Sequence, residues 1–219
     1  MPKWQKMKNN LFPISNNGFR YIFYAFVASI LFKVLDLDTL AFLSFILIFM
    51  IVYFFRNPER EVTIFDAGSV VSPVDGKVVS IEDLLKSEYG YKIIVQSSYF
   101  DIGVLRVPYE SSLTSVSNKS GSRLSLDVAV SRDLNAHAEL VFSNGKFNKI
   151  KVKHILTQSF APLDIILFKN QNIRQSARYG FMLNGFTEIY IPKNFRLNIN
   201  TGDKLTASES LLGFFIAIP

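Results

Sequence analysis

Asp75, His137 and His154 are the first side chains to consider for acid–base chemistry. Asp75 lies in the segment SPVDGKV, residues 72–78. A carboxylate can hold a proton-transferring base in position, although an aspartate followed by glycine is also ordinary turn sequence. His137 lies in an expected loop and His154 in an alternating segment, where a surface or hydrogen-bonded histidine is the ordinary interpretation. These residues alone therefore do not define a catalytic site.

Cysteine chemistry is excluded, because the chain contains no cysteine. This removes disulfides, thiolate metal sites, iron–sulfur clusters and cysteine nucleophiles. Two histidines also argue against a multi-histidine metal centre, so no metal site is predicted. Lys and Arg number 24 against 18 Asp and Glu, and the resulting charge of +6 suits an anionic membrane surface or nucleic acid.

The elements that carry these residues begin with two apolar runs. The chain has 219 residues, 49% of them hydrophobic, and a mean hydropathy of +0.22, which indicates a membrane segment. Residues 21–32 and 39–55 are uncharged, and Asp36 and Asp38 lie between them. Each run is shorter than the ~20 residues that span a bilayer comfortably. The pattern predicts a helical hairpin in the membrane, with a buried hairpin of a soluble domain as the alternative.

Basic residues flank the two runs on both outer sides. Arg20 precedes them together with Lys3, Lys6 and Lys8, and Arg56 and Arg60 follow. Positive flanks predict that both ends of the hairpin are cytoplasmic, and a shallow hairpin in one leaflet fits as well as a spanning one. The expected location is a membrane, the bacterial inner membrane, with the rest of the chain on its cytoplasmic face. The charge then reflects an anionic membrane surface, and nucleic acid is not expected as a partner.

The remainder of the chain predicts a mainly β (α+β) sandwich or barrel-like soluble domain. Short alternating runs follow one another without ten-residue helices between them. Only residues 82–88 look weakly helical, and Asn144-Gly145 is a strong hairpin turn. The predicted organisation is a basic segment at 1–20, a membrane hairpin at 21–55 and a β domain at 56–219. Strands are expected at 70–71, 77–81, 91–96, 138–142, 149–155, 163–168, 188–191 and 211–218.

An ordered set of short motifs resembles the phosphatidylserine decarboxylase family in its short, membrane-hairpin form. That family typically reads F-F-R-N/D-P-x-R, then S-P-A-D-G-x-V, F-D-V-H-V-N-R-x-P, R-F-G, Y-L-P and G-D-x-V. The motifs appear in the same order over nearly the whole chain. They are YFFRNPER at 53–60, SPVDGKV at 72–78, YFDIGVLRVP at 99–108, RYG at 178–180, YIP at 190–192 and GDKL at 202–205.

The resemblance implies a particular chemistry. Members of the family cleave themselves between glycine and serine, and the serine becomes a pyruvoyl group. The ketone of that group forms a Schiff base with phosphatidylserine and accepts electrons while carbon dioxide leaves. An aspartate and a histidine form the base system for self-cleavage. Asp75 matches the family aspartate, whereas Gly103 stands where the family has its histidine.

The cleavage site also departs from the family pattern F-G-S-R-V-D-x-Y-L-P. Counting from Gly180 places Gly185 on the family glycine and Phe186 on the serine, whereas counting back from Pro192 places Gly185 on the serine itself. Thr187 is the nearest hydroxyl, and cleavage before it would leave a 2-oxobutanoyl group. No cofactor is therefore predicted, because the serine that would become the pyruvoyl group is absent.

Three functions are compatible with these features. The first is an active decarboxylase of phospholipid (phosphatidylethanolamine) biosynthesis. The second is a non-catalytic relative, a pseudoenzyme that binds a phosphatidylserine-like membrane lipid or regulates an active partner within a homo- or hetero-oligomer. The third is a membrane-anchored barrel-sandwich adaptor, because SPVDGKV and GDKL also recur in lipoyl-like modules.

Overall fold

The structure is a computed structural model that describes residues 13–60, 68–84, 87–125, 131–145 and 148–216. The described residues fall into two compact units, a helical unit at 13–59 and a β unit at 60–216. The basic residues Lys3, Lys6 and Lys8 lie outside the described residues.

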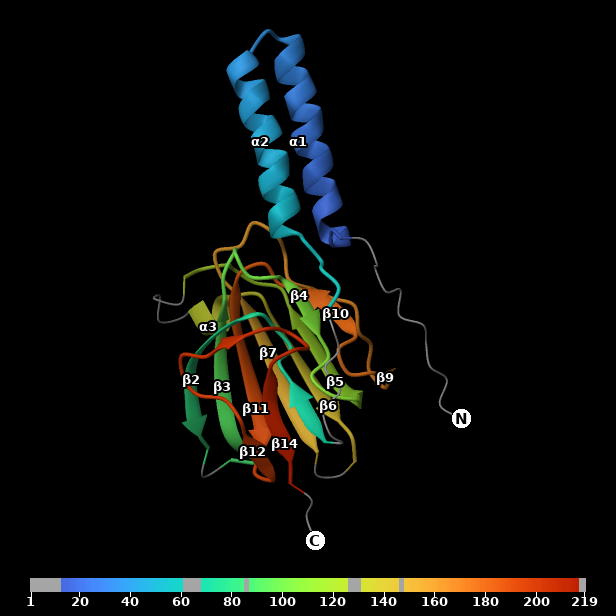
Figure 1. The fold of residues 1–219 in the computed structure, drawn as a ribbon, viewed down its shortest axis with the longest axis vertical. Coiled ribbons are helices and arrows are strands. Elements are labelled where there is room, and N and C mark those ends of the chain that lie inside the picture. The colour runs from blue at the N-terminus through green and yellow to red at the C-terminus, as the bar shows by residue number, and fades with distance from the viewer. Residues whose placement is uncertain (1–12, 61–67, 85–86, 126–130, 146–147, 217–219) are drawn as a thin grey trace. The chain divides into compact units, whose positions relative to one another are not determined.

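The helical unit is a pair of helices joined by a tight turn (Figure 1). Helix α1 spans Asn16–Val34, and α2 spans Asp38–Phe54. The turn contains Asp36 at φ 55°, and an ion pair of 2.6 Å between Lys33 and Asp38 spans it. The predicted pair of helices with an acidic turn is present, and α1 begins earlier than the apolar run at Tyr21.

Most large apolar side chains of the helical unit point outward. Phe23, Phe42 and Phe49, for example, are 61%, 63% and 62% exposed. Phe55, at the end of α2, is instead buried and packs closely on Gly18, where a Cβ would meet the Phe55 ring at 2.7 Å. In the part of the chain that the structure describes, no helix has both the length and the apolar character needed to cross a membrane.

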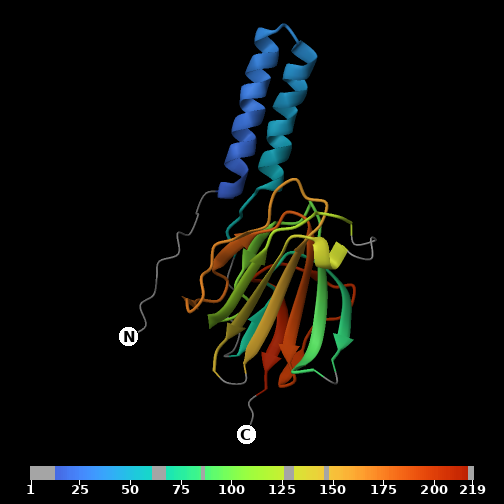
Figure 2. The ribbon, with the colours of Figure 1, turned by 180° about the vertical axis from the view of Figure 1, so that it is seen from behind.

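The β unit consists of three antiparallel sheets and one short helix, α3 (Ser131–Leu134), and Figure 2 shows its long strands side by side. The large sheet has the order β13-β2-β3-β11-β7-β6-β5-β9, and the small sheets have the orders β1-β14-β12 and β4-β10-β8. The strands are β1 (Ser69–Val71), β2 (Gly76–Asp83), β3 (Tyr89–Ser97), β4 (Val104–Arg106), β5 (Ser111–Lys119), β6 (His137–Ser143), β7 (Lys149–Leu156), β8 (Asp164–Ile165), β9 (Asn172–Ile173), β10 (Arg178–Phe181), β11 (Gly185–Pro192), β12 (Phe195–Leu197), β13 (Lys204–Leu205) and β14 (Leu211–Phe215).

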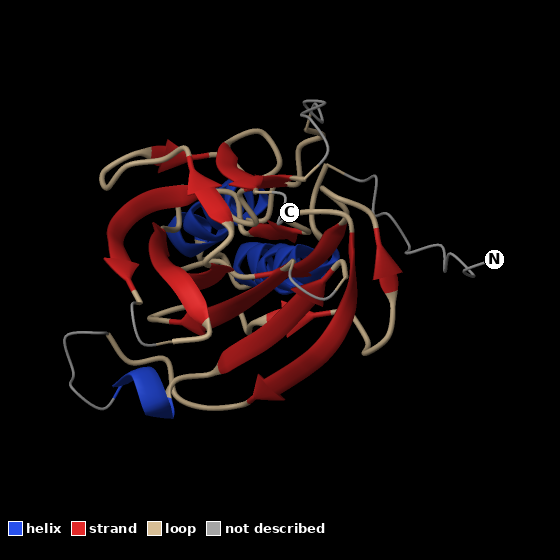
Figure 3. Ribbon diagram, turned by 90° about the horizontal axis from the view of Figure 1, so that it is seen from below, coloured by secondary structure: helices blue, strands red, loops and turns tan. Residues whose placement is uncertain are grey.

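One hydrophobic core lies between the large sheet and the small sheets (Figure 3). Residues alternate between buried and partly exposed along β6 and most of β7, as expected for strands with one face on a core. Leu140, Val152 and Ile189 contribute from the large sheet, and Leu105 and Leu212 from the small sheets. The mainly β prediction is therefore confirmed.

Some predicted elements differ from the observed ones. The helix predicted at 82–88 is wrong for Glu82 and Asp83, which continue β2 because they pair with Lys92 and Tyr91 of β3. The strand predicted at 163–168 is reduced to β8. The Asn144-Gly145 turn is confirmed between β6 and β7, with Gly145 at φ 91°.

Candidate functional site

Asp75 is fixed by three contacts at the turn before β2. Its Oδ2 lies 2.7 Å from Nη2 of Arg60, and its Oδ1 accepts a hydrogen bond of 2.8 Å from the amide of Ala207. The Ser97 hydroxyl donates to the Asp75 backbone carbonyl at 2.5 Å. Arg60 also reaches Glu209 at 3.4 Å. The carboxylate that matches the family aspartate is therefore engaged by an arginine and a backbone amide.

Burial raises the pKa of Asp75 above its ordinary value. The Ala207 amide and the Arg60 guanidinium counteract this effect, because both stabilise the ionised carboxylate. The charge of Asp101 raises the pKa, and the backbone amide of Ile102 lowers it. These influences show that the Asp75 carboxylate lies close to the segment that leads into Gly103.

Gly103 is buried where no side chain has room. A Cβ at this position would lie 2.8 Å from the carbonyl oxygen of Met182 and 2.9 Å from the ring of Phe181. The Gly103 carbonyl also accepts a hydrogen bond of 2.8 Å from the Met182 amide. The position assigned to the family histidine is thus closed by a backbone oxygen and an aromatic ring, and glycine fits it.

The segment around Gly185 lies inside the large sheet. Gly185 begins β11 and is paired with Ser97 of β3 and Leu156 of β7. Phe186 follows, with Gln96 and Ile155 as its partners. A Cβ on Gly185 would lie 2.3 Å from the carbonyl oxygen of Ile155, so the neighbouring strand approaches closely. Because Ser97 contacts Asp75 and pairs with Gly185, the structure brings these two predicted positions to the same end of the sheet.

Thr187 belongs to a buried polar group that the sequence did not predict. Its Oγ1 lies 2.9 Å from Nδ1 of His154, and Nε2 of His154 lies 2.6 Å from the Tyr179 hydroxyl. All three residues are fully buried. A neutral imidazole has one donor and one acceptor nitrogen, so two hydroxyls satisfy it completely.

Burial controls the ionisation of this group. It lowers the pKa of His154 to about 3 and raises the pKa of Tyr179 above its ordinary value. The imidazole is therefore neutral near pH 7. The alternating pattern of residues 149–155 could have predicted that His154 is buried, because His154 shares the buried face of β7 with Ile150 and Val152.

His137, the other histidine, was expected in a loop, but it begins β6, where it pairs with Ile155, and is half-buried. Its Nδ1 is 2.9 Å from the backbone carbonyl of Asn135. It is therefore a hydrogen-bonded histidine, in agreement with the ordinary interpretation.

Comparison with known proteins gives a consistent result. The family model described as "Phosphatidylserine decarboxylase" matches residues 47–213. Similar curated proteins are each named "Phosphatidylserine decarboxylase proenzyme". The protein from Desulfotalea psychrophila is 25% identical over 209 residues, which cover 93% of this chain and 97% of the relative. Those from Geotalea uraniireducens and Geobacter metallireducens are each 27% identical, covering 94% of this chain and 99% of the relative. No solved structure matches the chain.

Proposed function

Because the chain belongs to the phosphatidylserine decarboxylase family, we propose that it is a membrane-bound member that serves phospholipid metabolism without forming a pyruvoyl group. It binds a phosphatidylserine-like lipid, or regulates a catalytic partner, rather than decarboxylating the lipid itself. The family match favours this lipid role over an adaptor function.

The observation that carries the proposal is the setting of residues 185–187. Phe186 follows Gly185, so no hydroxyl is available where the pyruvoyl group would originate. Phe186 is paired on both sides within the sheet, and Thr187 projects to the buried face, where His154 holds its hydroxyl. The residues present therefore do not fit a pyruvoyl group.

The positions of the family histidine and aspartate also differ from what self-cleavage needs. Gly103 has no proton acceptor and no room for one. Asp75 is joined to Arg60 rather than to an imidazole, so its charge is compensated by a group that does not exchange protons near neutral pH. The absence of a hydroxyl at position 186 and the absence of a base at position 103 therefore both support the proposal that no pyruvoyl group is formed.

Membrane attachment is proposed from the helical unit. Helices whose apolar side chains face outward all round are found within protein interiors or in lipid. Here these side chains are exposed along both α1 and α2. We infer that the hairpin inserts into the bilayer and that the basic flanks, Arg20 and Arg56 among them, remain at the cytoplasmic headgroups. In a bacterium this membrane is the inner membrane.

The mass of the purified full-length chain tests the loss of self-cleavage. We expect one species near 24.9 kDa, the mass of the intact chain. Incubation with vesicles containing phosphatidylserine should release no carbon dioxide above the level of vesicles alone. Two chains divided near residue 185, or carbon dioxide release, would refute the proposal.

One contact favours a second candidate, self-cleavage before Thr187. The hydrogen bond of 2.9 Å to His154 places a base beside this hydroxyl, as nucleophilic catalysis requires. The same mass measurement distinguishes the two candidates, because this cleavage would divide the chain between Phe186 and Thr187.

A further inference from the structure

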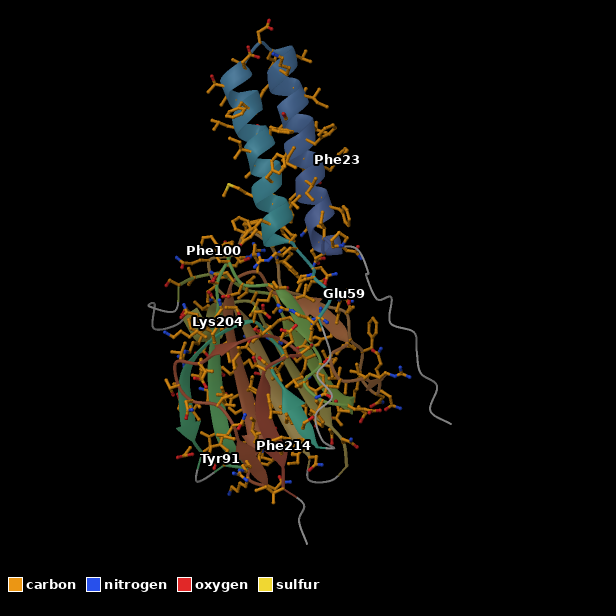
Figure 4. All side chains as sticks on the ribbon, in the orientation of Figure 1. Phe23, Glu59, Tyr91, Phe100, Lys204 and Phe214 are labelled. Atoms are coloured by element: carbon orange, nitrogen blue, oxygen red, sulfur yellow. The ribbon has the colours of Figure 1, made fainter. Side chains whose placement is uncertain are left out.

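An aromatic surface lies at the end of the β unit where β3 and β7 terminate. β3 ends at Ser97 and leads into Tyr99 and Phe100, whereas β7 ends at Leu156 and leads into Phe160. Tyr99 and Phe160 are stacked, with ring centroids 5.9 Å apart. The Phe100 side chain is 72% exposed, and Figure 4 shows it at the opposite end of the β unit from Tyr91.

The aromatic surface is held in a fixed arrangement. The Tyr99 hydroxyl donates to the Gln158 carbonyl at 2.5 Å, and the Arg123 guanidinium donates to the carbonyls of Ser159 and Phe160. The Tyr99 bond joins the loop after β3 to the loop after β7, and the Arg123 bonds join the segment after β5 to that same loop. These hydrogen bonds restrict Tyr99 and the loop that carries Phe160, so less conformational entropy is lost when these two rings contact a partner.

A row of lysines crosses the large sheet beside these loops. Lys204 is paired directly with Lys77, and the same row continues through Gln96, Phe186, Ile155 and His137 to Lys119. Directly opposed residues project from the same face of a sheet, and like charges in such pairs are unfavourable. Lys77, Lys119 and Lys204 are all exposed.

These three lysines differ from the others in the same sheet. Lys92, Lys149, Lys151 and Lys153 each form an ion pair with a glutamate. Lys77, Lys119 and Lys204 have no carboxylate partner among the described residues. Within the described residues, the lysine row therefore carries positive charge that no carboxylate pairs with, near the exposed rings of Phe100 and Phe160.

We propose that the aromatic surface and the lysine row form a second membrane contact, through which the β unit itself rests on an anionic lipid bilayer. Aromatic side chains favour the level of the headgroups, and lysines near an anionic surface are attracted to it. The contact rests on the proposed membrane attachment, but it uses residues of the β unit and not of the helices. It places the end of the sheet that holds Asp75 and Gly185 against the lipid headgroups.

The absence of native cysteine allows a single probe at this surface. We would replace Phe100 by cysteine in the full-length chain and attach an environment-sensitive fluorophore. Asp83→Cys provides the matched position, because Asp83 is exposed and lies in register with Tyr91 at the other end of the sheet. Vesicles of phosphatidylcholine, with and without phosphatidylglycerol, would carry a lipid-borne quencher.

The probe at position 100 should be quenched at least about twofold more in anionic than in neutral vesicles, and the probe at position 83 should be unaffected. Lys77→Glu with Lys119→Glu should abolish this difference. Lys193→Glu with Arg196→Glu, which makes the same change of charge beyond the other end of β11, should preserve it. Flotation of the chain with vesicles reports separately on the helical hairpin.

The outcomes separate the two proposals. A chain that floats with vesicles while its position 100 stays unquenched would refute the second contact and leave the hairpin attachment standing. Equal quenching in neutral and anionic vesicles, unchanged by the lysine substitutions, would refute the role of the lysine row. A chain that does not float would refute the membrane attachment and this contact with it.

Discussion

Thr187 and His154 lie opposite each other on β11 and β7, and their side chains meet at 2.9 Å inside the core. The first hydroxyl after Gly185 in the sequence is therefore bound to a neutral imidazole and shielded from solvent. This relationship leads to a first test of what the hydroxyl does.

Thr187→Val should destabilise the fold and leave the mass of the chain unchanged. The substitution keeps the shape of the side chain but leaves a buried nitrogen of His154 without a partner, which costs about 1–3 kcal/mol. Urea denaturation measures the loss. Thr114→Val is the control, because the Thr114 hydroxyl bonds to Val141 at an exposed site, and its removal should change stability by less than about 0.5 kcal/mol. An equal effect of both substitutions would contradict a special role for the buried group.

Acidification should destabilise the protein in a way that depends on His154. The pKa of His154 is about 3 in the folded chain and 6.5 in the reference state. Between these values the unfolded chain takes up a proton that the folded chain does not, so the free energy of unfolding falls as the pH drops. The stabilisation that the neutral His154 imidazole gives is fully present above pH 6.5. Below that pH the free energy of unfolding falls by at most about 1.4 kcal/mol per pH unit because of this residue.

Denaturation at a series of pH values compares the native chain with His154→Gln and His137→Gln. Between pH 6.5 and 3, the free energy of unfolding should fall less steeply with pH in His154→Gln than in the native chain, and His137→Gln should behave like the native chain. A parallel dependence in all three proteins would show that the imidazole of His154 does not contribute.

Arg60→Ala alone should lower the free energy of unfolding more than Arg60→Ala combined with Asp75→Asn. The side chains of Arg60 and Asp75 are only 13% and 12% exposed, so loss of the arginine leaves a nearly buried carboxylate uncompensated. We expect a cost of roughly 3 kcal/mol, the lower end of the range for a buried pair. Adding Asp75→Asn should recover part of it, because the amide oxygen still accepts from Ala207. A double variant no more stable than Arg60→Ala would contradict this account.

Leu43→Lys should weaken membrane attachment without unfolding the β unit. Leu43 is 54% exposed on α2, and a lysine at the centre of a lipid-inserted helix costs about 2.5–3.5 kcal/mol. Flotation with vesicles measures the binding. Val79→Lys, which places the same charge at a 45% exposed site on β2, is the matched control. Undiminished flotation of Leu43→Lys would contradict insertion of the helices.

The sequence predicted the parts of the fold that depend on local pattern. The apolar runs on either side of Asp36 predicted the helix pair, and Asn144-Gly145 predicted the β6–β7 hairpin. Strand β5 was missed because its segment SSLTSVSNK is rich in serine and lacks strong apolar alternation. It is stabilised by pairing with β6, which is distant in the sequence.

The site was predictable only in part, for a similar reason. The motif around Asp75 identified the residue but not its partner, because Arg60 and Ala207 are joined to it only by the fold. His154 was interpreted as an ordinary histidine, since Thr187 and Tyr179 become its neighbours only through the pairing of β7 with β11 and the approach of β10. Spacing in the sequence does not contain that information.

The tight packing at Gly103 limits which side chains this position can hold. A histidine placed there would meet the Met182 carbonyl and the Phe181 ring before it could approach Asp75. A Gly103→His substitution should therefore lower the stability of the fold without bringing an imidazole to the Asp75 carboxylate. An imidazole at position 103 therefore also requires the backbone around Met182 to move.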